Sequence, residues 1–209
     1  MKPYQSEIRN EARRRGVHQL FHFTLAGNVK SVLTHGLASQ VVLEERGIPF
    51  IATDKMRLDD CLEGVSLSIH SINQSMFAAK KRANQEEWVI LSFDASILWT
   101  HPCRFCWVNA ASREIRNHPG FIGGPWAFRK LFEDRATSSI DGNSVRESRS
   151  REDYEPTEND AEVQVLSPIS AELILGAVVR NDGVKEALEE LLGDVGRAMP
   201  VIVFEEFFS

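Results

Sequence analysis

Hydrophobic and polar residues follow two different periods along this chain, and together these periods predict both helices and strands. Residues 1–16 have the spacing of an amphipathic helix that ends in basic side chains. Alternating or continuous apolar segments predict strands at residues 18–23, 64–69, 88–93, 161–166, 173–179 and 201–204. Helical spacing lies between them, at residues 28–36, 73–81 and 126–131 and around Leu188, Leu191 and Leu192. The pattern predicts an α/β chain, which we interpret as a single domain over residues 1–209.

The helix after the first predicted strand carries signals for both of its ends. Asn28 is of the residue type that caps a helix N-terminus, and apolar residues recur at helical spacing from Val29 onward. Gly36 ends the predicted helix, with Leu37 placed to pack back against it. Further along, Asn181-Asp182-Gly183 is predicted as a turn before the last helix.

The composition is that of a folded protein, because 43% of the 209 residues are hydrophobic and four are tryptophan. The longest apolar runs are too short to span a bilayer, and residues 1–7 lack the apolar stretch of a signal peptide. We therefore expect a cytoplasmic protein without a membrane partner. Cys103 and Cys106 form a C-x-x-C pair, but no second pair completes a zinc site. We interpret these two residues and Cys61 as reduced structural thiols and expect no metal.

The net charge of −6 hides three local clusters of basic residues. Arg13-Arg14-Arg15 precedes the first strand, and Lys80-Lys81-Arg82 ends a predicted helix. The third cluster lies in the polar segment 136–159 and consists of Arg146, Arg149 and Arg151. A single cluster of this kind is usually a solvated face, and so polar a segment has disorder as its alternative. We predict that the segment recognises nucleic acid, with its arginines on phosphates and Tyr154 stacked on a base.

One carboxylate stands at the start of the strand predicted after that segment. Alternation places Ala161, Val163 and Val165 on one face of this strand and Glu162, Gln164 and Leu166 on the other. A strand holds a side chain more rigidly than a loop does, so Glu162 is a candidate catalytic group above a cleft. The alternative is a glutamate on an edge strand that points into water.

Several short motifs occur in an order that resembles one known family. They are His22 and Thr24, His35-Gly36-Leu37, Arg57, residues 65–69, Met76, residues 108–112 and Ala161-Glu162-Val163. This order is similar to that of the DarT family of nucleic-acid ADP-ribosyltransferase toxins, and the similarity spans most of the chain. The resemblance implies an ADP-ribosyltransferase fold, in which two packed, curved sheets surround a central NAD cleft and N-terminal helices flank one side.

The resemblance also implies that NAD is the substrate and assigns roles to individual residues. The resemblance makes Glu162 and Arg57 the catalytic residues. The cofactor-binding residues that it implies are His22, Thr24, Gly36, Leu37 and Met76. Departure of nicotinamide leaves a cationic ribosyl centre, which the carboxylate of Glu162 stabilises while it accepts a proton from the nucleophile. The planar fork of Arg57 clamps the diphosphate or orients the acceptor. His22 and Thr24 hydrogen-bond the ribose and the nicotinamide amide.

Three segments depart from the family pattern where its members shape the NAD and base pockets. Residues 65–69 replace an aromatic-rich strand, residues 71–75 replace a proline-bearing loop, and Val108 stands in place of an acid. The resemblance implies thymidine in single-stranded DNA as the acceptor, while guanine in DNA or a base in RNA stays open. Two other functions also stay open: an NAD-dependent RNA phosphotransferase, which favours basic residues in place of Glu162, and a catalytically silent nucleic-acid-binding module. A toxin of this family is expected to have a cognate antitoxin, either a macrodomain hydrolase or an inhibitor.

Overall fold

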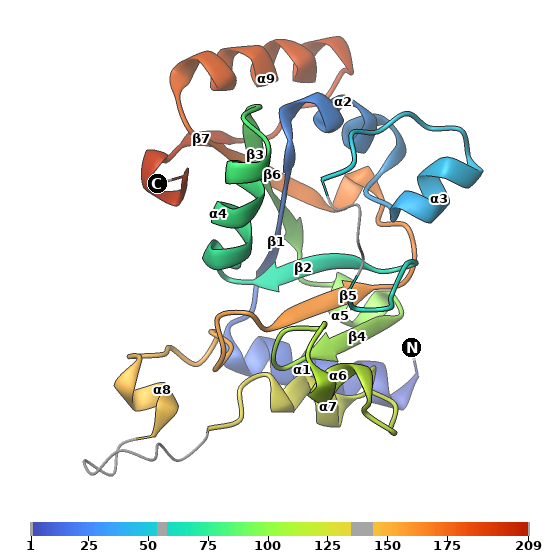
Figure 1. Cartoon of the computed structure of the whole chain (residues 1–209), viewed down its shortest axis with the longest axis vertical. Helices are drawn as coiled ribbons and strands as arrows, with labels where there is room; N and C mark the ends of the chain where they lie inside the picture. Colours follow the sequence, from blue (N-terminus) through green and yellow to red (C-terminus); the bar gives the residue numbers. More distant parts are fainter. Residues whose placement is uncertain (1, 54–57, 135–143, 209) are drawn as a thin grey trace.

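The computed structural model describes residues 2–53, 58–134 and 144–208, and a seven-stranded sheet lies at its centre (Figure 1). The strands are β1 (Gln19–Leu25), β2 (Val65–Ile69), β3 (Trp88–Asp94), β4 (Cys103–Cys106), β5 (Glu162–Val165), β6 (Ile174–Val179) and β7 (Val201–Val203). Their order in the sheet is β4-β5-β2-β1-β3-β6-β7. All neighbouring strands are antiparallel except β6 and β7, which are parallel.

Helices surround the sheet at both ends and at its sides. The α-helices are α1 (Pro3–Arg15), α2 (Ala26–His35), α3 (Gln40–Glu45), α4 (Gln74–Ala83), α5 (Ile97–Thr100), α6 (Arg113–Arg116), α7 (Pro125–Lys130), α8 (Val145–Ser148) and α9 (Asp182–Asp194). Two 3₁₀ turns are η1 (Ala171–Leu173) and η2 (Glu205–Phe208). The α/β class predicted from the sequence is confirmed.

The sheet forks between β1 and β2. On one side β1 pairs with β3 along all of its length, from Gln19 opposite Asp94 to Leu25 opposite Trp88. On the other side β1 pairs with β2 at two positions, and the two strands then separate, so that β2, β5 and β4 cross the direction of β1 (Figure 1). The two curved sheets expected from the sequence are therefore two halves of one sheet, joined at this short contact. A fork of this kind leaves space between its arms.

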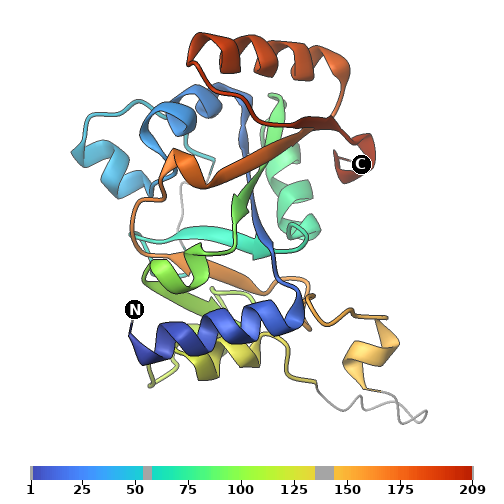
Figure 2. The ribbon, with the colours of Figure 1, turned by 180° about the vertical axis from the view of Figure 1, so that it is seen from behind.

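Aromatic side chains fill the core beneath the β2-β5-β4 half. Phe105 on β4 contacts Phe128 on α7 with ring centroids 5.2 Å apart, and both side chains are fully buried. Helix α1 packs against α5 and α7 behind these strands (Figure 2). Burial of each large apolar side chain contributes roughly 1.5–3 kcal/mol, so this layer holds β4 and β5 firmly in place.

Two helix starts predicted from the sequence are wrong. Helix α2 begins at Ala26 with Leu25 as its N-cap, so Asn28 lies inside the helix, where its side chain is buried. Asn181 is the N-cap of α9 and accepts a hydrogen bond from the amide of Val184 at 3.0 Å, so Asp182 and Gly183 belong to the helix and not to a turn. Asparagine is a common N-cap residue, but residue type alone does not decide its role. Asn28 was predicted as a cap and lies inside a helix, whereas Asn181 was predicted in a turn and is a cap.

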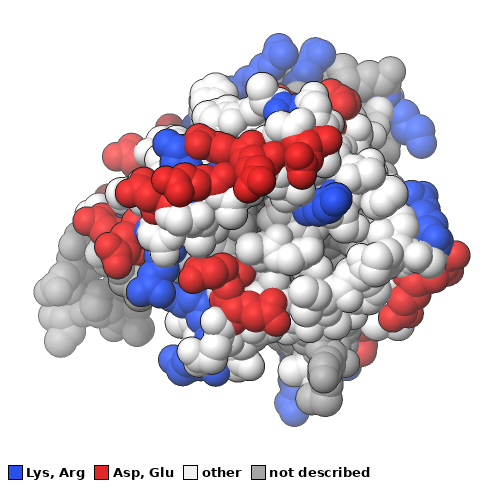
Figure 3. All heavy atoms as spheres, turned by 90° about the horizontal axis from the view of Figure 1, so that it is seen from above, with Lys and Arg blue, Asp and Glu red and all other residues white. Residues whose placement is uncertain are grey.

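The surface at the α9 end of the molecule is strongly acidic (Figure 3). Exposed acidic residues on this helix are Asp182, Glu186, Glu189, Glu190 and Asp194, and Lys185 is the one basic residue in the helix. Among the described residues, no helix has the length and apolar character needed to cross a membrane. Within the same ranges, no group of three or more His, Cys, Asp or Glu side chains is placed to hold a metal ion.

Candidate active site

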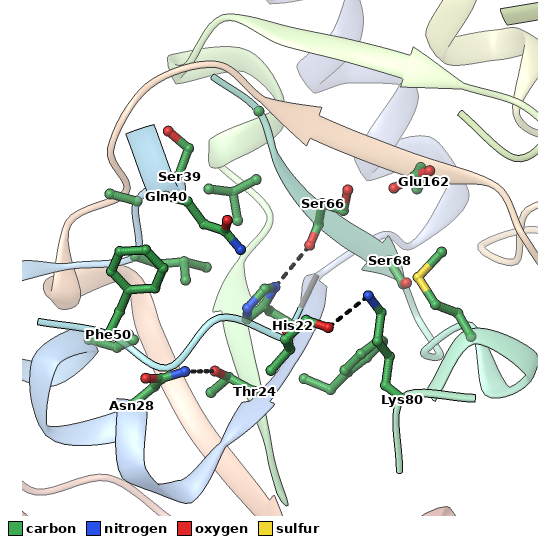
Figure 4. Close-up of a pocket in the computed structure, with 18 of the residues that line it drawn as sticks. His22, Thr24, Asn28, Ser39, Gln40, Phe50, Ser66, Ser68, Lys80 and Glu162 are labelled. Carbon is green, nitrogen blue, oxygen red and sulfur yellow. Dashed lines mark hydrogen bonds between the residues drawn. The ribbon is translucent and has the colours of Figure 1, made fainter. Parts of the chain in front are cut away.

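A cleft of about 430 Å³ opens at the fork between β1 and β2 (Figure 4). Its volume lies in the usual range for small-molecule sites. The residues assigned from the sequence that line this one cleft are His22, Thr24, Gly36, Leu37, Met76 and Glu162. They come from β1, the end of α2, the start of α4 and β5, so residues far apart in the chain meet here. Arg57, the other predicted catalytic residue, lies outside the described residues.

Glu162 is held on an interior strand. It is the first residue of β5, which pairs with β2 on one side and with β4 on the other. The backbone amide of Ala110 donates a hydrogen bond to Glu162 Oε1 at 3.1 Å. Two neighbours of that amide, Asn109 and Ala111, also line the cleft. The carboxylate is partly buried and fixed by both its strand and this amide, which excludes the alternative of an edge-strand glutamate.

His22 presents one defined ring nitrogen to the cleft. Its Nδ1 donates a hydrogen bond to the carbonyl oxygen of Ser66 at 2.9 Å, because a carbonyl can only accept (Figure 4). Burial lowers the pKa of His22 below its ordinary value, although the contact with Ser66 opposes this shift. A neutral ring with its proton on Nδ1 has an unprotonated Nε2, which is a hydrogen-bond acceptor. His22 is therefore suited to accept a hydrogen bond from a hydroxyl or amide group of a ligand.

We expect acid to destabilise the folded protein through His22. The folded pKa lies below the ordinary value near 6.5, so the unfolded chain binds more protons in the window between the two values. The free energy of unfolding should rise as the pH increases through this window, by about 1.4 kcal/mol for each unit of pKa lowering, and this gain should be lost again on acidification. Urea unfolding of the wild type and His22→Gln, from about pH 5 to about pH 8, measures the difference.

His101 makes the comparison with His22→Gln necessary. Burial lowers the pKa of His101 as well, so the pH dependence of the wild type alone has more than one source. The variant should keep the contribution of His101 and lose that of His22. Equal pH dependence in the two proteins would show that His22 carries no linked proton.

Asn28 and Lys80 fix the segment that borders the cleft opposite β2. The side chain of Asn28 accepts from the amide of Ile51 at 2.7 Å and donates to the carbonyl of Ile51 at 3.0 Å. It also donates to Thr24 Oγ1 at 3.2 Å, and Lys80 Nζ donates to the carbonyl of Thr53 at 3.0 Å (Figure 4). These contacts connect α2 and α4 to residues 51–53, which border the cleft. No local pattern predicts the contact of Asn28 with Ile51 or that of Lys80 with Thr53, because each joins residues more than 20 positions apart.

Gly36 and Leu37 form the floor of the cleft where the chain leaves α2. The amide of Leu37 donates to the carbonyl of Ile169 at 2.9 Å, and the amide of Ile169 donates to the carbonyl of Leu37 at 2.8 Å. Gly36 has a φ of 84° and a ψ of 174°, a conformation that is essentially restricted to glycine. A Cβ atom at this position would overlap the carbonyl oxygen of Ile169. The predicted role of Gly36 at the end of this helix therefore has a steric cause.

A family model described as "ssDNA thymidine ADP-ribosyltransferase, DarT" matches residues 21–209. The chain belongs to the DarT family. All DarT motifs named from the sequence, apart from Arg57 outside the described residues, lie in or directly beside the cleft at the fork.

Solved DarT structures have the same fold as this chain. Thermus sp. 2.9 DarT in complex with NAD+ superposes with a TM-score of 0.59 at 13% identity, covering 90% of this chain and 96% of that one. The same protein in complex with ADP-ribosylated ssDNA gives a TM-score of 0.56 at 15% identity, with coverage of 90% and 95%. Thermosipho africanus DarTG in complex with ADP-ribose gives 0.56 at 17% identity and covers 91% of this chain. The chain spans 50% of the length of that DarTG protein. No curated protein sequence is significantly similar to the chain.

A second buried polar contact ties the Glu162 strand to the rim of the cleft. Gln164, which is fully buried on β5, donates from Nε2 to Asp59 Oδ2, and Asp59 Oδ1 accepts from the amide of Cys61 at 3.4 Å. Cys106 Sγ donates to Gln164 Oε1 at 3.8 Å. Burial first, and then the charge of Glu162, raises the pKa of Cys106, so this cysteine is a neutral thiol. Cys61, Cys103 and Cys106 are all buried thiols, in agreement with their interpretation as structural residues.

The residues predicted to bind nucleic acid lie outside the cleft, around α8. The guanidinium of Arg146 donates to the carbonyls of Glu152 and Glu155, at 2.6 Å and 2.8 Å. Arg149 donates to the carbonyl of Thr157 at 2.9 Å and forms an ion pair with Glu158 at 2.7 Å. Arg151 Nη2 donates to Asn159 Oδ1. The ring centroids of Tyr154 and His70 lie 4.4 Å apart. These arginines brace residues 144–159, and their contact with phosphates stays a prediction.

Proposed function

We propose that this protein transfers ADP-ribose from NAD to thymidine in single-stranded DNA. The observation that carries the proposal is the position of Glu162 in the wall of the cleft, where the amide of Ala110 holds its carboxylate. His22, Thr24 and Gly36 line the same cleft and are able to contact a nucleotide. Membership of the DarT family supports the same reaction. The bond between nicotinamide and C1′ of its ribose breaks, and a nucleophilic atom of the thymine base forms the new bond to C1′.

The side chains of the cleft divide the work of this reaction. The carboxylate of Glu162 offsets the positive charge that develops on the ribose and accepts the proton that the base loses. His22 Nε2 accepts a hydrogen bond from a ribose hydroxyl or from the nicotinamide amide, and Thr24 lies two residues further along β1 in the same cleft. Gly36 and Leu37 provide a surface that the diphosphate or ribose atoms of NAD can approach closely. Arg57 stays the predicted clamp for the diphosphate.

Acidic side chains are distributed unevenly over the surface that single-stranded DNA can approach. The α9 end is acidic and repels phosphates, whereas Glu162 lies in the other half of the sheet (Figure 1, Figure 3). We therefore place the DNA path on the β5 side of the molecule, where residues 144–159 lead into Glu162. Arg149 is the candidate phosphate contact on this path, because its side chain is 41% exposed, whereas that of Arg151 is 13% exposed and pairs with Glu155 and Asn159.

Mass spectrometry of oligonucleotides incubated with the protein and NAD tests the proposal. We expect DNA with a single thymidine to gain the mass of one ADP-ribose, and we expect DNA without thymidine and RNA of the same length to stay unmodified. Modification of the thymidine-free DNA or of the RNA would move the acceptor to guanine or to an RNA base. No mass gain on any oligonucleotide, with release of nicotinamide also absent, would contradict the transferase function.

The same spectra address the phosphotransferase alternative. That chemistry favours several cations in the cleft, and Lys80 is the one lysine or arginine among the described residues that line it. Its ammonium group is directed to the carbonyl of Thr53. Loss of phosphate from RNA, without gain of ADP-ribose on DNA, would favour the phosphotransferase.

A further inference from the structure

A second, smaller hollow lies at the start of β1 and the end of β2. Its volume is about 220 Å³, and its walls include Val17, His18, Gln19, Ile69, His70 and Tyr154. We call it the Tyr154 pocket. Ile69, the last residue of the segment 65–69, is the one residue of the family motifs named from the sequence that lines it, and the reaction proposed for the cleft does not use the pocket.

The Tyr154 pocket adjoins the cleft along the same two strands. Phe21 and Ser68 face each other across β1 and β2 and both line the cleft. The next registered pair is Leu20 and Ile69, and one step further along each strand stand Gln19 and His70, which line the pocket. Two residues of a strand span about 7 Å, so Phe21 and Gln19, which border the two hollows, lie about as far apart as neighbouring nucleotides of one DNA strand.

The walls of the pocket are aromatic and are held in place. The rings of His70 and Tyr154 lie 4.4 Å apart with an angle of 50° between their planes. His70 has a φ of 66°, a left-handed conformation that is uncommon for a residue other than glycine and that keeps its ring at the end of β2. Its side chain is 42% exposed, and its Nε2 lies 3.8 Å from Glu155 Oε1.

Two arginines hold the backbone on either side of Tyr154. Arg146 donates to the carbonyls of Glu152 and Glu155, and Arg15 donates to the carbonyl of Asp153 at 3.3 Å. Tyr154 also packs against the main hydrophobic core. The cluster of arginines therefore positions an aromatic ring beside the cleft.

We propose that the Tyr154 pocket binds the base of the nucleotide adjacent to the thymidine that is modified. This inference rests on the function proposed above. Stacking on Tyr154 and His70 accounts for the aromatic walls, and the exposed polar side chains of His18 and Gln19 are able to hydrogen-bond the edge of a base. Arg13, exposed in the last turn of α1, supplies positive charge near the pocket for the connecting phosphates, whereas the guanidinium of Arg14 is paired with Glu11.

Substitutions at the two walls, combined with abasic DNA, test the pocket. The oligonucleotides contain one thymidine and either natural neighbours or an abasic nucleotide immediately before or after it. The protein variants are Tyr154→Leu, which keeps apolar packing but removes the ring, Tyr154→Phe as the matched control, and His70→Asn, which tolerates the left-handed backbone. Fluorescence anisotropy gives the Kd of each pair, and mass spectrometry gives the rate of transfer.

We expect the wild type to bind roughly 10-fold more weakly when one of the two neighbouring bases is removed. Tyr154→Leu should bind natural DNA more weakly by a similar factor and should lose little more when that base is absent, because both changes remove one stacking contact. Tyr154→Phe should bind both kinds of DNA as the wild type does. His70→Asn should lose affinity in the same pattern as Tyr154→Leu, by a smaller factor. Additive losses in Tyr154→Leu and His70→Asn, or equal affinity for natural and abasic DNA in the wild type, would overturn the inference.

The two readouts separate this inference from the proposed function. Coupled binding losses without ADP-ribose transfer would keep the pocket as a base-binding site and refute the transferase reaction. Transfer to thymidine with additive binding losses would keep the reaction and refute the pocket. Tm values of the three variants identify a loss that comes from unfolding, and His70→Asn then decides the result if Tyr154→Leu does not fold.

Discussion

Glu162→Gln is expected to abolish ADP-ribose transfer while leaving the fold unchanged. Glutamine keeps the shape of the side chain and still accepts the hydrogen bond that Ala110 donates to Oε1. It removes the negative charge that stabilises the ribosyl cation and the base that takes up the proton. Loss of one preorganised electrostatic contact typically costs about 10²–10³ in rate, and loss of the proton acceptor adds to this. Timed mass spectrometry of a thymidine oligonucleotide with NAD measures the rate.

Glu189→Gln is the matched control for this experiment. Glu189 lies on α9, its side chain is 52% exposed, and it is not among the residues that line the cleft. The same change of charge at this position should leave transfer at the rate of the wild type. Transfer by Glu162→Gln at that rate, with an unchanged Tm, would remove Glu162 from the catalytic machinery.

The strand that carries Glu162 could be predicted from the sequence, but its place inside the sheet could not. Alternation around Val163 and Val165 indicated the strand, and both residues are in the core. The sequence left open an edge strand, because β4 consists of the four residues Cys103–Cys106 and has no period long enough to recognise. Once β4 pairs with β5, Glu162 stands on an interior strand. A strand this short is defined by its partner and not by its own pattern.

Polar side chains with distant partners were the main source of error in the site. Asn28 was assigned to a cap because of its residue type, whereas its amide serves Ile51, which is 23 residues away. The alternation placed Gln164 on the same face as Glu162, but it did not indicate that Gln164 is fully buried and bonded to Asp59. The sequence identifies a group able to form such hydrogen bonds, but the fold decides which distant backbone or side chain receives them.

The arginines of residues 144–159 illustrate the same limit for charge. Their clustering in the sequence favoured contact with phosphates, since a run of cations is the usual mark of a nucleic-acid surface. In the folded loop, Arg146 satisfies the carbonyls of Glu152 and Glu155 instead. A polar segment without regular secondary structure needs donors for its carbonyl groups, and a guanidinium supplies up to five. The cluster therefore supports the placement of Tyr154, which the sequence did associate with base stacking.

Gly36→Ala is expected to be the most destabilising single methyl addition at the cleft, with a loss of about 2–5 kcal/mol in the free energy of unfolding. Two effects add. The backbone at Gly36 has φ 84° and ψ 174°, which an alanine adopts only with strain, and the new Cβ would meet the carbonyl oxygen of Ile169. Relief of this overlap must separate Leu37 from Ile169, where two hydrogen bonds of 2.9 Å and 2.8 Å join the end of α2 to the segment before η1.

Gly196→Ala separates the overlap at Gly36 from the cost of the backbone conformation. Gly196 also has a positive φ, 67°, but a Cβ there meets no atom within 4 Å. Urea unfolding of both variants should show a clearly larger loss for Gly36→Ala, and the affinity for NAD, measured by calorimetric titration, should fall in this variant alone because Gly36 and Leu37 line the cleft. If the two variants lost equal stability and both bound NAD as the wild type does, the close contact between Gly36 and Ile169 would have no role in shaping the site.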